Sequence, residues 1–194
     1  MKFYHAPGAC SLAAHILLHE AGLAYEPIRV DIPTRRTEAG DNFAAVNPKG
    51  YVPALAFEDG RVLTENVAIL DWLSRQAPEL APRDEAGRTR LIEMLAFLST
   101  ELHKPFIRLF FPAGDAERDQ MAEAVAGRFD WLAGRIEGGY LLDGRFGAAD
   151  AFLYVMSRWA GTLGVPLPGP VAAHAALVEG RPSVQAALRS EGLS

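Results

Sequence analysis

The chain has 194 residues, of which 49% are hydrophobic, and this is enough for one large domain or two small ones with buried cores. Its formal net charge is −5 at pH 7, and its basic residues form no dense cluster. Because nucleic-acid binding relies on a dense Lys and Arg surface, the charge pattern argues against a nucleic-acid partner.

Membrane insertion and a disulfide framework are also disfavoured. No apolar run in the sequence approaches the roughly 20 residues that cross a bilayer, and the first residues lack the pattern of a signal peptide. The sequence has one cysteine, which excludes an internal disulfide. We therefore expect a cytoplasmic protein with no membrane partner.

Residues 1–77 alternate between strand and helix patterns. Strands are predicted at 2–4, 25–30, 54–57 and 61–63, and helices at 11–21 and 67–73, with an irregular helical turn at 43–46. Asp59-Gly60 predicts a hairpin turn, and Thr64 or Asn66 can cap the helix that follows. This βαβ-ββα order predicts an α/β, thioredoxin-like domain with a mixed sheet.

The remainder of the chain has helical patterns throughout. Residues 78–87 contain Pro78 and Pro82 and are expected to form a linker. Helices are then predicted at 88–111 with a kink at Pro105, at 115–136 with Asp115 as the cap, and at 147–163, 171–178 and 182–188. We therefore expect residues 88–194 to form an all-α helical bundle.

Cys10 lies between the first strand and the first helix. Pro7 and Gly8 end the strand, and Cys10 or Ser11 begins the helix. Unpaired backbone N–H groups and the positive end of the macrodipole at a helix start favour thiolate over thiol. The alternative is an inert buried cysteine that packs as a small hydrophobic residue.

The first helix also carries two histidines one turn apart. His15 and His19 lie on the side opposite to Leu12 and Ile16, so we expect them on a solvated face. Such a pair can bind a metal ion, but no third ligand occurs at a usable spacing. The sequence therefore predicts no metal site.

Five motifs give the chain a resemblance to a known family. Together and in this order they resemble the soluble glutathione S-transferases, most closely the bacterial beta class. The motifs are Pro-Gly-Ala-Cys-Ser-Leu from Pro7, Asn-Pro-x-Gly-x-Val-Pro from Asn47, Leu-Thr-Glu-Asn-x-Ala-Ile from Leu63, Glu-Leu-His-Lys from Glu101, and Arg-Pro-Ser-Val-Gln-Ala-Ala-Leu from Arg181.

This resemblance implies a catalytic group. Cys10 faces the sulfur of bound glutathione and can form a mixed disulfide with it, and the hydroxyl of Ser11 could donate to a thiolate. His103 is implied to enter the cleft from the helical domain. Beyond it, Phe106 and Phe110 are candidates for the wall of a hydrophobic electrophile site, although the sequence does not distinguish this role from packing in the core.

The resemblance also implies how glutathione itself is held. The Val52–Pro53 peptide is expected to be cis, which leaves the Val52 N–H and C=O to pair with the cysteinyl backbone of glutathione. Glu65 is implied to hold the γ-glutamyl ammonium and the backbone N–H of Asn66 the γ-glutamyl carboxylate. Arg35 suits the glycine carboxylate.

Three functions follow from this interpretation. The first is a homodimeric glutathione transferase that conjugates glutathione, its co-substrate, to small hydrophobic electrophiles without a prosthetic group or metal. The second is a monothiol, glutathione-dependent disulfide reductase acting through Cys10, since Ala13 stands where a Cys-x-x-Cys pair has its second cysteine. The third is a non-catalytic protein-binding module.

Overall fold

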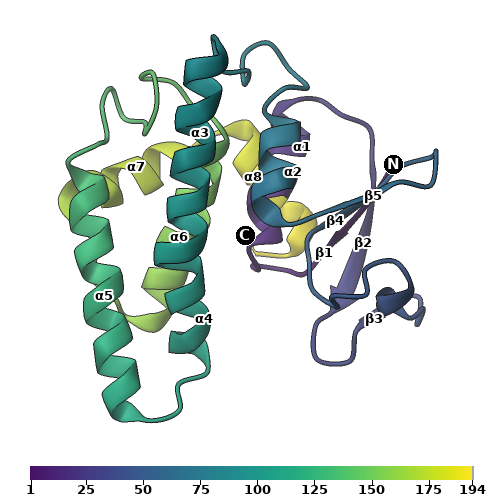
Figure 1. Ribbon diagram of the computed structural model, residues 1–194, viewed down its shortest axis with the longest axis horizontal. Helices are drawn as coiled ribbons and strands as arrows, with labels where there is room; N and C mark the ends of the chain where they lie inside the picture. The colour runs from purple at the N-terminus through teal and green to yellow at the C-terminus, as the bar shows by residue number, and fades with distance from the viewer. Residues whose placement is uncertain (194) are drawn as a thin grey trace. The chain divides into compact units, whose positions relative to one another are not determined.

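A computed structural model of the chain describes residues 1–193, and within them five strands form one mixed sheet (Figure 1). The strands are β1 (Lys2–His5), β2 (Glu26–Asp31), β3 (Arg36–Thr37), β4 (Ala54–Ala56) and β5 (Val62–Thr64), in the spatial order β3-β2-β1-β4-β5. β1 is parallel to β2, and the other pairs are antiparallel. The predicted βαβ-ββα domain with a mixed sheet is confirmed.

Two compact units make up the described chain. One runs from Met1 to Ala81 and includes the C-terminal segment from Pro182, and the other spans Pro82–Arg181. The first contains the sheet, α1 (Ser11–Glu20), α2 (Asn66–Leu73), α8 (Pro182–Glu191) and a 3₁₀ turn, η1 (Phe43–Ala45). The last helix therefore groups with the N-terminal residues, whereas the sequence analysis counted it with the helical bundle.

Side chains of β1 alternate between the two faces of the sheet, as a strand requires. Phe3 and His5 face α1, where each has a ring contact with His15. Tyr4 lies on the other face and packs against Phe43 of the η1 turn. Both faces of the strand that leads to Cys10 are thus buried.

A buried carboxylate joins α8 to the start of α1. Glu191 Oε2 accepts the Gly8 N–H at 2.8 Å, and Glu191 Oε1 lies 2.8 Å from His15 Nδ1 and 3.4 Å from His5 Nδ1. The side chains of Glu191 and His15 are fully buried. Burial acts to raise the pKa of Glu191, but hydrogen bonds from His15, His5 and Gly8 outweigh it and leave the pKa lowered.

The expectation of a solvated histidine face on α1 was therefore wrong. His15 is buried against Glu191, and His19 is half-buried with its Nε2 3.0 Å from the Tyr25 hydroxyl. The amphipathic pattern could not reveal this, because α8 lies more than 160 residues further along the chain and covers that side of α1.

The second unit is all-helical. Its helices are α3 (Glu85–Phe97), α4 (Lys104–Phe110), α5 (Asp115–Ala133), α6 (Ala148–Leu163) and α7 (Gly169–Glu179). α6 is the central helix, with side chains such as Phe152 and Tyr154 buried, and it packs against α3, α4 and α7. In Figure 1, α5 runs alongside the α3–α4 rod, in the opposite direction.

Two details of the helical unit differ from the sequence expectations. The interruption expected at Pro105 is a π-helical segment, η2 (Leu98–His103), that ends just before it, since proline has no N–H to continue the i to i−4 ladder. Asp115 does not cap α5. Gly114 is the N-cap, and Glu117 accepts the Ala113 N–H at 2.6 Å.

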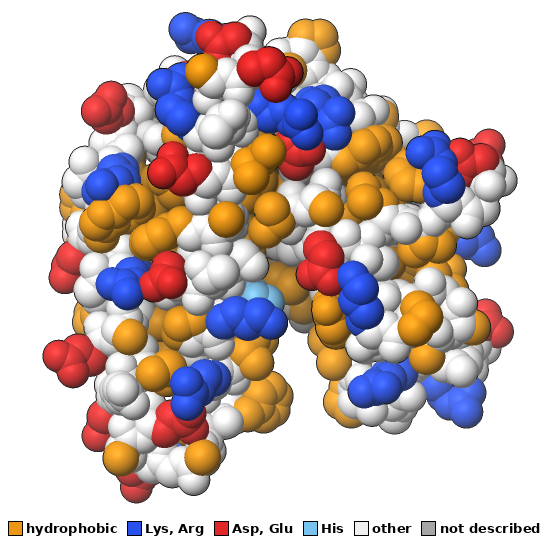
Figure 2. All heavy atoms as spheres, in the orientation of Figure 1, with side chains coloured by type: hydrophobic (Ala, Val, Ile, Leu, Met, Phe, Trp, Pro, Cys, Tyr) orange, Lys and Arg blue, Asp and Glu red, His pale blue; other side chains and the backbone are white. Residues whose placement is uncertain are grey.

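The surface agrees with the charge pattern. On the face shown in Figure 2, acidic and basic side chains are interspersed, with no continuous basic area. Among the described residues, no helix combines the length and the apolar character needed to cross a membrane.

Glu191 gives a test of this fold. We expect Glu191→Ala to lower the free energy of unfolding by about 3 kcal/mol at pH 7, because it leaves buried donors on His15 and Gly8 without an acceptor. Urea unfolding measures the change, and the exposed Glu123→Ala serves as the control. Equal stability of the two variants would contradict the role of the carboxylate.

The same residue predicts a pH dependence. Since the pKa of Glu191 is lowered in the folded protein, its stabilisation is present above its ordinary value of 4.5 and is lost as the pH falls through the lowered value. Glu191→Gln should therefore lose less stability than the wild type between pH 5 and pH 3. Parallel acid-unfolding curves would count against this assignment.

Candidate active site

A tight turn before β4 forms one side of the candidate site. Asn47, which is only 1% exposed, donates from Nδ2 to the Tyr51 carbonyl at 2.8 Å and accepts the Lys49 N–H on Oδ1 at 3.2 Å. Gly50 adopts a φ of 77°, which favours glycine. The Val52–Pro53 peptide that follows is cis, as predicted.

Cys10 lies against this turn. Its thiol donates to the Val52 carbonyl at 3.7 Å across 42 positions of sequence, and both residues are buried. Cys10 has helical φ and ψ and directly precedes α1, as the sequence analysis expected. The contact to Val52 uses the protonated thiol, because a thiolate cannot donate to a carbonyl.

Ser11 has a different environment from the predicted one. Its side chain is fully buried, and its hydroxyl donates to the Ala6 carbonyl and accepts the Ala6 N–H, both at 3.2 Å. The one O–H donor that the prediction assigned to a thiolate is therefore bonded within the strand-to-helix turn. Ser11 therefore stabilises that turn through its two hydrogen bonds to Ala6.

The start of α2 forms the opposite side of the site. Glu65 is the N-cap, and its φ of 73° is a left-handed conformation that costs energy for a non-glycine residue. Neither Thr64 nor Asn66 caps this helix, which corrects the sequence expectation. Both polar atoms of the Asn66 side chain are buried and have no hydrogen-bond partner among the described residues.

Two side chains contact the Glu65 carboxylate. Lys49 Nζ forms an ion pair with Oε1 and also donates to the Thr64 hydroxyl at 2.9 Å, and the Tyr51 hydroxyl donates to Oε1 at 3.2 Å. The hydrogen bond to Glu65 raises the pKa of Lys49, which is therefore protonated at neutral pH. Burial and the Glu65 charge raise the pKa of Tyr51.

Arg35 lies over the same turn. It is exposed, with a φ of 55°, and a Cβ at Gly50 would approach its Nε to 2.9 Å. The side chain of Arg35 thus rests on the bare backbone of Gly50. Five of the predicted site residues lie in the first unit, around this turn and the start of α2. They are Cys10, Arg35, Val52, Pro53 and Glu65.

In the helical unit, His103 belongs to an aromatic cluster. Its ring centroid lies 5.3 Å from that of Trp159 and 6.0 Å from that of Phe152. Burial, with a smaller contribution from the Lys104 charge, lowers the pKa of His103 to about 4. The imidazole is therefore neutral at pH 7, so it can form a hydrogen bond but supplies no positive charge.

The two predicted electrophile residues separate in the structure. Phe106 is fully buried and packs on Phe129 and Trp159, so it is a core residue and its assignment to a pocket wall was wrong. Phe110 is half-buried and meets Trp159 edge to face at 5.2 Å. Of the two residues, only Phe110 has a side chain that remains partly exposed.

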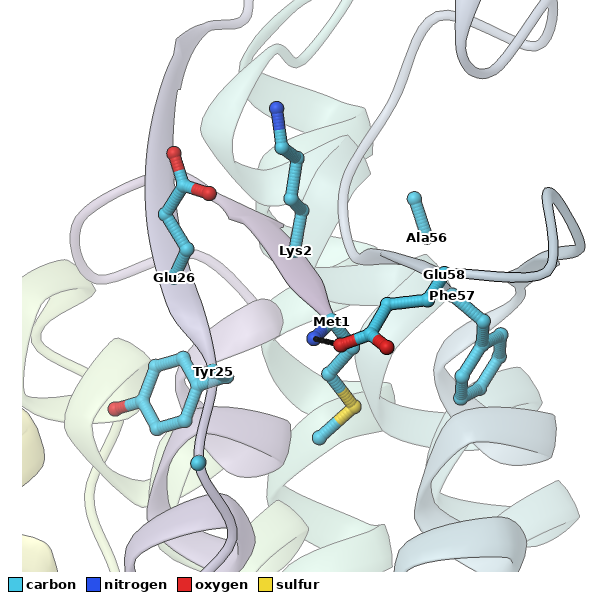
Figure 3. Close-up of a pocket in the computed structure, with 8 residues that line it drawn as sticks. Met1, Lys2, Tyr25, Glu26, Ala56, Phe57 and Glu58 are labelled. Carbon is cyan, nitrogen blue, oxygen red and sulfur yellow. Dashed lines mark ion pairs between the residues drawn. The ribbon is translucent and has the colours of Figure 1, made fainter.

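A cavity of about 470 Å³ in the first unit lies away from Cys10. Met1, Lys2, Tyr25, Glu26 and Glu58 help to line it, and the Met1 amino group pairs with Glu58 at 3.8 Å (Figure 3). These residues gather at the beginning of β1, whereas Cys10 follows the end of that strand. The cavity is therefore separate from the candidate site.

The buried cluster of His5, His15 and Glu191 offers three ligands, two imidazoles and a carboxylate, of kinds that metals accept. One ligand atom of each lies within 4.8 Å of the others. However, both carboxylate oxygens already accept hydrogen bonds, from Gly8 and from His15. The carboxylate is therefore already engaged, whereas His15 Nε2 has no hydrogen-bond partner among the described residues, and the absence of a metal site remains a prediction.

Similarity to known proteins identifies the family of the chain. The family model for the glutathione S-transferase N-terminal domain matches residues 8–76. The glutathione S-transferase GstA of Escherichia coli O157:H7 is 40% identical over 200 residues, covering all of both chains. The chain belongs to the glutathione S-transferase family.

Solved structures support the assignment of the chain to this family. A bacterial beta-class glutathione S-transferase from Sphingomonas chungbukensis has a TM-score of 0.94 and 41% identity, with all of both chains covered. A sphingomonad glutathione S-transferase in complex with glutathione has a TM-score of 0.93 and 40% identity, again over all of both chains. The resemblance to the bacterial beta class is confirmed.

Sequence reasoning missed the group around Glu65. Lys49 and Tyr51 stand within the Asn47–Pro53 motif, but their side chains were not assigned a role, and Thr64 in the next motif was considered only as a helix cap. A signal existed, because a lysine and a tyrosine flank the glycine of a tight turn. Only the pairing of that turn with the start of α2 shows that both reach one carboxylate.

His103 gives a pH-dependent prediction. Between pH 6.5 and pH 4 the unfolded chain binds a proton at this histidine and the folded protein does not, so folding should lose up to about 3 kcal/mol over this range. His103→Gln, which is neutral throughout, should lose less. Urea unfolding at pH 7.5 and pH 4.5 measures the difference, and an unchanged pH dependence in the variant would contradict it.

Replacement of Asn66 is expected to stabilise the folded protein. Asn66→Ala removes two buried polar atoms that have no partner, and we expect it to raise the free energy of unfolding by about 1–2 kcal/mol. Asn42→Ala is the matched control, because the Asn42 side chain caps η1 by accepting the Ala44 N–H and its loss should destabilise. Thermal and urea unfolding distinguish the two signs.

Proposed function

We propose that the first unit binds glutathione between Cys10, the turn around the cis Val52–Pro53 peptide and the start of α2, for conjugation to small hydrophobic electrophiles. The observation that carries the proposal is the convergence of a thiol, a backbone turn with a cis peptide and a carboxylate at a helix start within one unit. The relative solved with glutathione supports it. Membership of the family makes the chain a glutathione S-transferase with glutathione as its co-substrate.

Each end of glutathione has a matching group in this proposal. Glu65 takes the γ-glutamyl ammonium, and the N–H of Asn66 at the first position of α2 takes the adjacent carboxylate. The backbone of Val52 pairs with the cysteinyl residue as a strand would. Arg35, a guanidinium beside the turn, suits the glycine carboxylate.

The reaction requires a glutathione thiolate. The thiolate attacks the electrophilic carbon, a carbon–sulfur bond forms, and the leaving group departs with its electron pair. Cys10 supports the thiolate by turning its S–H from the Val52 carbonyl to the glutathione sulfur, next to the positive end of α1. Ser11 contributes by holding the turn through Ala6.

The helical unit supplies the surface for the electrophile. We assign this role to the aromatic cluster of His103, Phe110 and Trp159, because aromatic rings give an apolar surface for a small hydrophobic molecule. His103 is neutral at pH 7 and acts there through hydrogen bonding. Homodimer formation, which the family resemblance implies, and the cytoplasmic location expected from the sequence belong to the same proposal.

Calorimetric titration with glutathione tests the proposed site. We expect Glu65→Gln to weaken binding about tenfold, because a hydrogen bond between two charged groups becomes one to a neutral amide. Glu58→Gln makes the same charge change on a side chain that is 96% exposed in the β4–β5 hairpin, and should leave affinity unchanged. No binding heat from the wild type would favour the protein-binding module.

Cys10→Ser separates the two enzymatic functions. A transferase in which Cys10 only supports the thiolate should retain aryl transfer with a reduced rate. A monothiol reductase should lose disulfide reduction completely, because the attacking sulfur is gone. Rates of both reactions for the variant and the wild type decide between them.

A further inference from the structure

The Glu65 carboxylate is already paired with a cation of the protein itself. Lys49 Nζ bridges Glu65 Oε1 and the Thr64 hydroxyl, and the Tyr51 hydroxyl donates to the same Glu65 oxygen. The Lys49 ammonium thus occupies a position on this carboxylate that resembles the one proposed for the ligand ammonium. Both groups carry one positive charge and N–H donors.

The backbone fixes both partners of this pair. Lys49 follows Pro48, and its own N–H is bonded to the buried Asn47 side chain, so the turn sets the direction in which Lys49 leaves the chain. Glu65 is held by its left-handed φ at the cap of α2. The four-carbon stem of Lys49 is the flexible part of the pair.

The pair is exposed enough to be exchanged. The side chains of Lys49 and Glu65 are 44% and 53% exposed, so water can solvate Lys49 as soon as it leaves the carboxylate. Exposed ion pairs contribute little to stability. Exchange of one ammonium for another keeps the charge on Glu65 balanced and buries no unpaired ion.

We propose that Lys49 is a specificity-determining residue, an internal counter-ion that holds Glu65 until the ammonium of a γ-glutamyl ligand displaces it. This inference rests on the proposed function, because it concerns the same site. A ligand that lacks the ammonium leaves Lys49 on Glu65 and does not compete with it. Lys49 therefore sets how strongly the enzyme distinguishes γ-glutamyl peptides from deaminated ones.

A double-mutant cycle with two ligands tests this proposal. The dissociation constants of glutathione and of its analogue with the ammonium replaced by hydrogen are measured by calorimetry for the wild type, Lys49→Met, Glu65→Gln and the double variant. We expect the ratio of analogue to glutathione dissociation constants to rise about two- to fivefold in Lys49→Met, since the competitor is gone. In the Glu65→Gln background, Lys49→Met should leave the ratio unchanged.

The Glu65→Gln background separates competition from general electrostatics. Loss of a positive charge near an anionic ligand changes the ratio in either background, whereas competition for Glu65 requires the carboxylate. Lys2→Met, at the far end of β1 from Cys10, is the matched charge control and should keep the wild-type ratio.

The outcomes are distinct for the two proposals. An unchanged ratio in Lys49→Met, or an equal rise in both backgrounds, overturns the role of Lys49 while glutathione binding stands. No binding of glutathione to the wild type overturns the proposed function itself, and with it the role of Lys49. A rise in the ratio that occurs only in proteins that keep Glu65 supports both the proposed function and the role of Lys49.

Discussion

The buried Glu191 carboxylate is the interaction on which the candidate site depends. It is charged in the folded protein because its hydrogen bonds outweigh the cost of burial, and it accepts the Gly8 N–H two residues before Cys10. The position of the thiol is thereby tied to a helix at the other end of the chain. Breaking these hydrogen bonds leaves buried donors on Gly8 and His15 and a buried carboxylate without partners, so the packing of α8 stabilises the turn that precedes Cys10.

A second hydrogen-bond network, around Asn47, holds the backbone of the turn before β4, just as the Glu191 network holds the turn that precedes Cys10. The Asn47 side chain bonds to Tyr51 and Lys49 and sets the turn that leads into the cis Val52–Pro53 peptide. The Cys10 thiol then meets the Val52 carbonyl. The two networks therefore converge on one contact, and neither provides it alone.

Local patterns predicted the fold and failed where distant segments meet. The strand and helix order and the placement of Cys10 before α1 follow from short-range signals: proline, glycine and apolar periodicity. The cis peptide and the other candidate site residues were implied by the family resemblance and not by local patterns. His15 was assigned to solvent because its partner Glu191 is 176 positions away. Phe106 was assigned to a pocket because core and pocket aromatic residues have the same pattern, and only burial distinguishes them.

The electrostatics of the site favour dipoles over full charges as the support for a thiolate. His103 is neutral at pH 7, Ser11 donates to the backbone, and Lys49 is paired with Glu65. What remains near Cys10 is its own S–H and the N–H groups at the start of α1, which are fixed by the Glu191 network before any ligand binds. Preorganised N–H dipoles need no rearrangement during the reaction, whereas in the proposed function the Cys10 S–H turns from the Val52 carbonyl to the ligand sulfur. Arg35 and Glu65 carry full charges beside the turn and at the start of α2, and in the proposed function they recognise the two charged ends of the peptide.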